Sequence, residues 1–194
     1  MSEENGIISR SGKRAKLENP ARVAELNPAG TLRSIGFHAG QSLCDIGAGS
    51  GLFSIAAAEL GASDVWAADT DADVLADLKQ RTGGLPNLHV LPVEGCAYPL
   101  ADASADWILL ATVLHEIRED RTALFEELRR ILKPGGSLCL IEFIKAPTPM
   151  GPPPVHRLGA REAEQLLAGA GFTKSSERNL GENLYCQTYR VSSR

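Results

Sequence analysis

The sequence predicts an α/β fold in which seven mostly parallel strands form one open, doubly wound sheet with helices on both faces. The first observation behind this prediction is that apolar runs and segments of helical periodicity alternate from Gln41 onward. The second is that the runs SLCDI, WILLA and SLCLIEFI are apolar on both faces, as is typical of parallel strands covered on each side. The last two apolar runs have no helix between them, so we expect one antiparallel strand at or near the edge.

Each predicted strand is a short apolar or alternating run bounded by turn residues. The runs SLCDI, DVWAAD, LHVLPV, ADWILLATVL and SLCLIEFI supply the first five strands. TKSSER and NLYCQTYRV follow as two late strands around the turn NLGEN. In chain order, the strands are expected at 42–46, 64–69, 88–93, 105–114, 137–144, 173–178 and 183–191.

Helices are predicted where apolar residues recur three and four positions apart between these strands. Two Asn-Pro steps before Gln41 suit helix starts with proline at the first helical position, so one or two short helices are expected there. The helix after the second strand is capped by Thr70 or Asp71, and the KPGG segment stops the one before the fifth strand. The longer helices are expected at 51–60, 71–81, 120–132 and 159–171.

Composition places the chain among single-domain globular proteins. Its 194 residues suffice for one core, with 43% hydrophobic and 23% charged residues. A net charge of −4 without a dense basic block argues against nucleic acid as a partner, although RNA and protein substrates stay open. No apolar run approaches the roughly 20 residues that span a bilayer. We expect one domain over 17–194, preceded by a flexible polar tail over 1–16 without a secretory signal.

The cysteines and histidines show neither disulfide nor metal-binding spacing. The four cysteines are scattered without a CxxC motif, which suits a reducing compartment, so a cytoplasmic location is expected. No His/Cys/Asp cluster has ligand spacing, so no metal is expected. Cys44 and Cys139 lie in apolar runs and are expected to act as small core hydrophobes.

A glycine-rich loop follows the first strand and opens a helix. Asp45 is followed by Gly47, Gly49 and Gly51, in the pattern G-x-G-x-G. Glycine permits positive φ and leaves no Cβ between the backbone and a ligand, and ligands of open parallel sheets sit at this strand end. The pattern matches neither the dinucleotide fingerprint nor a P-loop. A phosphate-free nucleoside with an amino-acid tail fits better, and the alternative is a tight turn without a ligand.

Two further acids end neighbouring strands. Asp69 ends the second strand, where a carboxylate accepts two hydrogen bonds from a ribose diol; the alternative is a helix N-cap. Glu94 follows the third strand and could accept a hydrogen bond from an exocyclic amine such as that of adenine. Its alternative interpretation is a solvated loop acid.

Together these motifs resemble the class I S-adenosylmethionine-dependent methyltransferases. LCDIGAGSG resembles their first motif, WAADTD the acidic end of the second strand, and LRRILKPGGSLCLIEF the turn before the fifth strand. The resemblance covers roughly Pro20 to the C-terminus and is nearest to small ubiquinone/menaquinone C-methyltransferase-like and arsenite-methyltransferase-like proteins. PMGPPPVHRL is similar to a segment of an uncharacterised bacterial branch of that group.

The resemblance implies a Rossmann-like fold that binds S-adenosyl-L-methionine and releases S-adenosyl-L-homocysteine. It implies direct in-line methyl transfer to a small-molecule acceptor, with 17–40 as a lid or as helices packed on the sheet edge. The implied cofactor contacts come from Asp45, Gly47, Ala48, Gly49, Gly51, Asp69, Thr70, Glu94, Gly95, Cys96 and Ala111. Arsenite is not expected as the acceptor, because only Cys96 lies near the pocket.

Two histidines are candidates for catalysis and substrate binding. His115 lies just beyond the fourth strand, where it could serve as a general base or only border the cofactor. His156 follows the proline-rich loop with Arg157 beside it, and the pair could clamp a substrate or an anion, or tie the loop to the next helix. The prolines could make the segment MGPPP a stiff wall over the acceptor, or a plain crossover.

Other classes of function stay open at this point. The chain could bind S-adenosylmethionine without transferase activity, as a sensor or partner subunit. A nucleotide-dependent oxidoreductase is a third hypothesis, which the glycine spacing disfavours. The sequence does not identify the acceptor atom as carbon, nitrogen, oxygen or sulfur, and it is compatible with a monomer or a homodimer.

Overall fold

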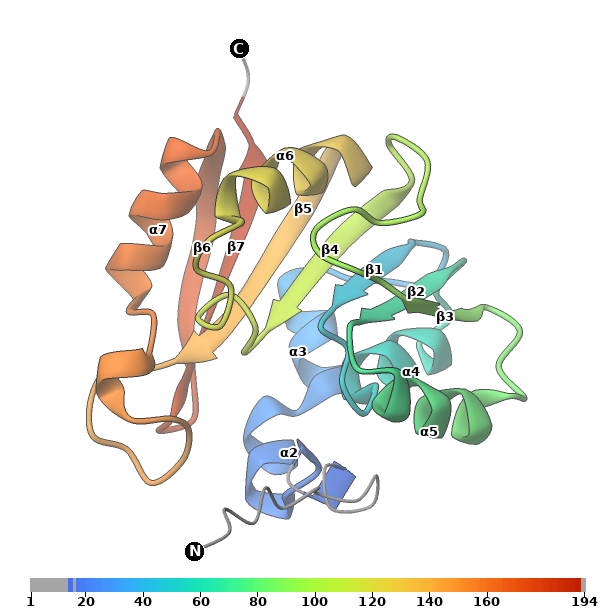
Figure 1. Ribbon diagram of the computed structural model, residues 1–194, viewed down its shortest axis with the longest axis horizontal. Coiled ribbons are helices and arrows are strands. Elements are labelled where there is room, and N and C mark those ends of the chain that lie inside the picture. The colour runs from blue at the N-terminus through green and yellow to red at the C-terminus, as the bar shows by residue number, and fades with distance from the viewer. Residues whose placement is uncertain (1–13, 16, 193–194) are drawn as a thin grey trace, which may run out of the picture.

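A seven-stranded sheet runs through the molecule in the computed structural model, which describes residues 14, 15 and 17–192 (Figure 1). Within this part of the chain the strand order is β3-β2-β1-β4-β5-β7-β6, and only β7 runs antiparallel to its neighbours. The predicted fold class, including one antiparallel strand near the edge, is confirmed. The strands are β1 (Leu43–Ile46), β2 (Val65–Asp69), β3 (Leu88–Pro92), β4 (Ala105–Ala111), β5 (Leu132–Phe143), β6 (Phe172–Leu180) and β7 (Leu184–Val191).

Helices cover both faces of this sheet, as Figure 1 shows. Buried side chains of α2, α3, α4 and α5 pack on one face, and those of α6 and α7 on the other. A short 3₁₀ turn, η1 (Pro154–His156), lies in the proline-rich loop. The helices are α2 (Pro20–Leu26), α3 (Pro28–Ile35), α4 (Leu52–Glu59), α5 (Ala72–Thr82), α6 (Arg121–Ile131) and α7 (Ala160–Gly169).

The strands alternate between two buried clusters, which explains why their runs are apolar throughout. In β1, Cys44 and Ile46 pack toward α6 and α7, whereas Leu43 packs toward α3 and α4. In β5, Leu140 and Ile141 divide in the same way. Burial on both faces is what parallel strands under two helical layers require.

Asparagine and aspartate set the helix starts. Asn19 caps α2, accepting hydrogen bonds from the backbone of Ala21 and Arg22, with proline next to it as predicted. Asn27 joins α2 to α3 with a left-handed φ of 38°. Of the two caps left open for α5, Asp71 is the one used.

Two strand boundaries differ from the prediction by three residues or more. The strand β4 ends at Ala111 because Thr112 takes a φ of 59°, which a β-branched residue in a strand cannot adopt. The strand β5 already starts at Leu132, and the register jumps from Ala105↔Leu132 to Trp107↔Ser137, so KPGG forms an irregular bulge within it.

The N-terminal helices are attached to the other end of the chain. Glu25 in α2 accepts hydrogen bonds from the backbone N and the side-chain Nδ2 of Asn183, at 2.5 and 2.8 Å. The predicted tail, 1–16, lies outside the described residues except for 14 and 15, and the domain boundary at 17 stays a prediction. No helix among the described residues is long and apolar enough to cross a membrane.

Candidate cofactor and acceptor site

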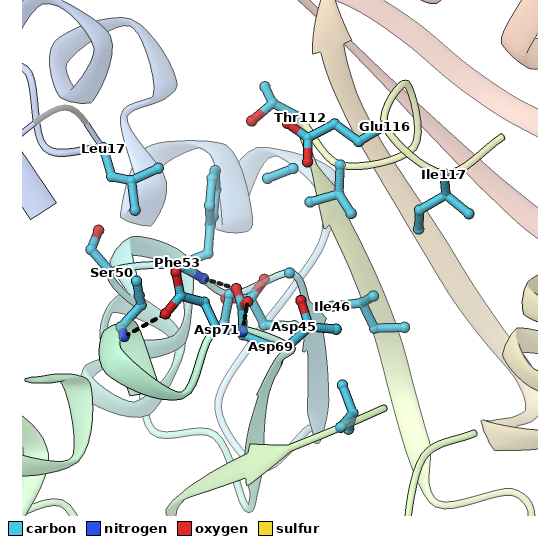
Figure 2. Close-up of a pocket in the computed structure, with 18 of the residues that line it drawn as sticks. Leu17, Asp45, Ile46, Ser50, Phe53, Asp69, Asp71, Thr112, Glu116 and Ile117 are labelled. Carbon is cyan, nitrogen blue, oxygen red and sulfur yellow. Dashed lines mark hydrogen bonds between the residues drawn. The ribbon is translucent and has the colours of Figure 1, made fainter. Parts of the chain in front are cut away.

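A pocket of about 550 Å³ opens at the carboxyl ends of β1, β2 and β4. Figure 2 shows Asp45 and Asp69 on one side of it and Thr112, Glu116 and Ile117 on the other. Leu17, before α2, also lines this space. The pocket therefore lies where parallel sheets bind ligands, beside the strand at which the chain order reverses.

The glycine loop needs its glycines for two different reasons. Gly47 and Gly49 have φ values of 68° and 53° and line the pocket. A Cβ on Gly47 would collide with the side chain of Val113. Gly51, with φ of 79°, does not line the pocket, and a Cβ there would collide with Leu78 of α5. Gly51 is thus required for packing at the start of α4, and its implied contact with the cofactor stays a prediction.

The Asp69 carboxylate holds the glycine loop in place. Its Oδ2 accepts a hydrogen bond from the Gly49 backbone at 2.8 Å, and its Oδ1 accepts one from the Asp71 backbone at 2.9 Å. Asp69 also lines the pocket. One side chain therefore organises the loop and presents carboxylate oxygens to the pocket.

Asp45 is buried below the loop. The Ser54 hydroxyl donates to its Oδ2 at 2.5 Å. Burial raises the pKa of Asp45 to about 6; the Ser54 hydrogen bond opposes this rise, and the negative charge of Asp69 adds to it. A positive ligand group in the pocket would favour the ionised form of this carboxyl.

Most of the implied cofactor residues meet in this pocket. Glu94 is an exception, because its side chain is exposed and does not line the pocket. It thus matches the alternative interpretation of a solvated loop acid. The implied residues that do line the pocket are Asp45, Gly47, Ala48, Gly49, Asp69, Thr70, Gly95, Cys96 and Ala111.

A second pocket of about 580 Å³ adjoins the first, and the two share several lining residues, among them Leu17, Arg22 and Thr112. Its other walls come from the end of β5, the start of β7 and the proline-rich loop. These walls are mainly apolar, and the residues that form them are Phe143, Met150, Gly151, Pro152 and Leu184. Three residues of the MGPPP segment thus line the space beside the first pocket, and its role as a wall over an acceptor stays a prediction.

His115 lies at the edge of the second pocket. Its side chain is 9% exposed, and its Nδ1 lies 2.8 Å from Oε2 of Glu142, while its backbone N donates to Oε1 at 3.0 Å. Burial lowers the pKa of His115, but the hydrogen bond and charge of Glu142 outweigh burial, so the pKa is raised above its ordinary value. The ring of Phe143 meets the imidazole edge-on, with centroids 6.1 Å apart.

Arg157 does not reach either pocket, contrary to the predicted anion clamp. Its side chain is buried, and all of its terminal nitrogens donate within the loop. The acceptors are the carbonyl oxygens of Ile144, Ala146, Met150 and Pro152 and the Thr148 hydroxyl. His156 is exposed in η1, on a shallow surface depression that His115 also borders. Arg157 therefore fits the alternative interpretation, in which its side chain holds the proline-rich loop in place.

Arg22, which the sequence patterns did not single out, lines both pockets. Its Nη2 donates to the Thr112 hydroxyl at 2.9 Å, and its guanidinium lies 6.0 Å from the Phe143 ring centroid. Burial lowers the pKa of Arg22, opposed by the charge of Glu142. Among the described residues, its buried Nε has no hydrogen-bond partner. The NPAR segment carries no motif that would have singled this arginine out.

Comparison with known proteins identifies the family. Residues 44–140 match the model of a methyltransferase domain. The chain belongs to this methyltransferase domain family. The matched segment contains the glycine loop and the ends of β1, β2 and β4, which surround the first pocket. The predicted family is thereby confirmed.

The methyltransferase relatives include quinone-modifying enzymes. The chain is 33% identical over 120 residues to a demethylmenaquinone methyltransferase of Clavibacter sepedonicus, covering 62% of this chain and 48% of that one. It is 32% identical to a ubiquinone/menaquinone biosynthesis C-methyltransferase of Chromobacterium violaceum, covering 77% of this chain and 74% of the other. The chain spans about half the length of the demethylmenaquinone methyltransferases it matches.

A solved structure matches nearly the whole chain. A SAM-dependent methyltransferase from Aquifex aeolicus superposes with a TM-score of 0.87 at 26% identity. The match covers 94% of this chain and 98% of the other. The methyltransferase fold therefore extends beyond residues 44–140 to both sides.

Proposed function

We propose that the protein transfers a methyl group from S-adenosylmethionine to a small apolar acceptor. The observation that carries this proposal is the pair of adjoining pockets at the carboxyl ends of the strands. One is floored by bare glycine backbone with two acids, and the other is walled by apolar side chains. Membership of the methyltransferase family and the Aquifex aeolicus structure support it.

The first pocket has the groups that the cofactor needs. Asp69 would accept hydrogen bonds from the ribose hydroxyls, and Thr70, Gly95 and Cys96 would border the adenine. Gly47 and Gly49 would let the amino-acid end lie on the backbone, with Asp45 below to balance its positive charge. Bound there, S-adenosylmethionine supplies a methyl group already activated on a sulfonium. The protein then has to align the acceptor and exclude water.

The second pocket suits an acceptor with an apolar ring. Phe143, Met150 and Leu184 would contact its faces, and Arg22 and His115 offer polar groups at its border. The quinone-modifying relatives support a quinol-type ring as the acceptor class.

No group of three or more potential metal ligands occurs among the described residues.

Calorimetry with S-adenosylhomocysteine and with NAD tests the cofactor. We expect binding of the former alone; binding of NAD alone would refute the proposal. Incubation with S-adenosylmethionine and a short-chain demethylmenaquinol, followed by mass spectrometry, tests transfer. Cofactor binding without transfer to any of a panel of phenols, amines and thiols would favour a binding protein instead.

The affinity for S-adenosylmethionine is expected to fall as the pH drops below about 6. The pKa of Asp45 is about 6 in the free protein, and the positive ligand would favour its ionised form. Binding below that pH must therefore release a proton, at a cost of up to about tenfold in affinity per pH unit. Calorimetry in two buffers of different ionisation enthalpy measures the proton release. Asp45→Asn should remove the pH dependence and His115→Gln should retain it, and equal wild-type affinity at pH 5 and pH 7 would contradict the assignment.

A further inference from the structure

Glu142 is a charged residue near the end of an apolar strand. It lies one position before the end of β5, its side chain is fully buried, and its neighbours Ile141 and Phe143 belong to the core. A buried carboxylate is costly unless it is paired or hydrogen-bonded. Both of its oxygens accept hydrogen bonds from His115. Oε1 accepts from the backbone N, and Oε2 accepts from Nδ1. The buried carboxylate of Glu142 is therefore paired with His115 through both of its oxygens.

This contact determines the tautomer of His115. An ionised carboxylate only accepts hydrogen bonds, so Nδ1 must carry a hydrogen. In the neutral ring Nε2 then has a free lone pair, and His115 borders the second pocket. The edge-on contact with Phe143 restrains the ring from its other side. The imidazole is thus held with one nitrogen occupied and the other able to take a proton.

We propose that Glu142 is a positioning residue that makes His115 the proton acceptor for a substrate carrying a weakly acidic hydroxyl. This inference rests on the proposed function and narrows its substrate class to phenol- or enol-type acceptors. An acceptor that is already ionised, or that has no proton to lose, would gain nothing from the pair.

The atoms and charges balance over the transfer step. The hydroxyl proton passes to Nε2 of His115, and the resulting oxyanion or its conjugated carbon forms a bond to the methyl carbon. The sulfur–methyl bond breaks with its electron pair left on sulfur. When the methylated atom is carbon, the proton on that carbon then passes through solvent to the ketone oxygen, which restores the aromatic ring and its hydroxyl. One positive charge leaves the sulfonium and one appears on His115, where the Glu142 carboxylate stabilises it.

The surroundings of His115 favour its protonated form, in agreement with its raised pKa. Glu116, 76% exposed, lies 3.8 Å from Nε2, and Arg118 opposes the effect. A stronger base has a larger driving force for taking the proton of a weakly acidic hydroxyl. The other charged or titratable groups bordering the same spaces are Arg22, Asp71, Arg121, Lys145, His156, Arg157 and Glu162.

Nuclear magnetic resonance of ¹⁵N-labelled histidine tests the pair without any turnover. With S-adenosylhomocysteine present, His115 of the wild type should titrate above its ordinary pKa, with Nδ1 protonated in the neutral form. Glu142→Gln should move the titration to lower pH, whereas Glu142→Asp should restore it in part. Glu119→Gln is the matched control, because it removes an exposed carboxylate from the loop that carries His115. It should leave the titration of His115 unchanged.

An unchanged His115 titration in Glu142→Gln would overturn the inference, as would a wild-type His115 protonated at Nε2 when neutral. If Glu142→Gln does not fold, the wild-type tautomer and the Glu142→Asp titration decide. These outcomes are independent of the cofactor calorimetry, so failure of the inference and failure of the proposed function are distinguishable.

The rate measurement uses 1,4-naphthohydroquinone as the probe. The rate should fall as the pH drops through the pKa of His115. Glu142→Gln should lower the plateau rate by about tenfold or more while changing KM little, and should move the acid limb to lower pH. An equal loss at every pH with an unmoved acid limb would show a merely structural role and would contradict the inference.

Discussion

Replacing Asp69 with alanine is expected to weaken binding of S-adenosylhomocysteine by about 100- to 1,000-fold. Two hydrogen bonds from the ribose hydroxyls to a carboxylate contribute about 3–4 kcal/mol together, and 1.4 kcal/mol is tenfold. The variant also loses the acceptors of the Gly49 and Asp71 backbone, which shape the loop before the ligand arrives. Both losses act on the same equilibrium, and calorimetry measures their sum.

Asp64→Ala is the matched control for this experiment. Asp64 lies just before the opposite end of β2, where it pairs with His89 at 3.0 Å, far from the glycine loop. Its removal should leave the affinity unchanged. An Asp69→Ala protein that is folded by circular dichroism and binds within threefold of the wild type would contradict the role given to Asp69.

The second large effect concerns the stability of the proline-rich loop. Arg157→Ala removes the donors that serve five oxygen atoms between Ile144 and Pro152. At about 0.5–1.5 kcal/mol per hydrogen bond, and with some oxygens regaining water, a loss of about 3 kcal/mol is expected. The melting temperature should then fall by about 6–12 °C.

Arg161→Ala provides the comparison, because Arg161 is an exposed arginine on the neighbouring helix α7. It should shift the melting temperature by less than 2 °C. Since Met150, Gly151 and Pro152 line the second pocket, Arg157→Ala should also weaken acceptor binding more than cofactor binding. A melting temperature within 2 °C of the wild type would show that the loop does not depend on this side chain.

The sheet could be predicted because each strand carries its own signal. Apolar runs on both faces identify parallel strands, and the missing helix between the last two runs identifies the antiparallel one. The ends of the strands were harder to predict from the sequence. The turn at Thr112 depends on a backbone φ of 59°, and the KPGG bulge depends on pairing with β4, neither of which an apolar run reveals.

The position of the first pocket was predictable for a related reason, because parallel strands bring their carboxyl ends to one edge of the sheet. The second pocket was not, apart from its proline-rich wall. Arg22, Phe143 and Leu184 come from three segments far apart in the sequence and lack a shared motif. Glu142 lies within an apolar run, and its role follows only from its contact with His115 in the folded protein. Arg157 was predicted as a candidate, but its position in the sequence does not show whether its side chain bonds to the loop or to a ligand.

The attachment of α2 to Asn183 has a consequence for the order of events during synthesis. The two partners are 158 positions apart, so at about 5–20 residues per second Asn183 leaves the ribosome's active centre about 8–32 s after Glu25. The first five strands are complete before then, while Arg22 still lacks the anchor of its helix. Because Arg22 lines both pockets, the pockets reach their final form only once the last hairpin has emerged.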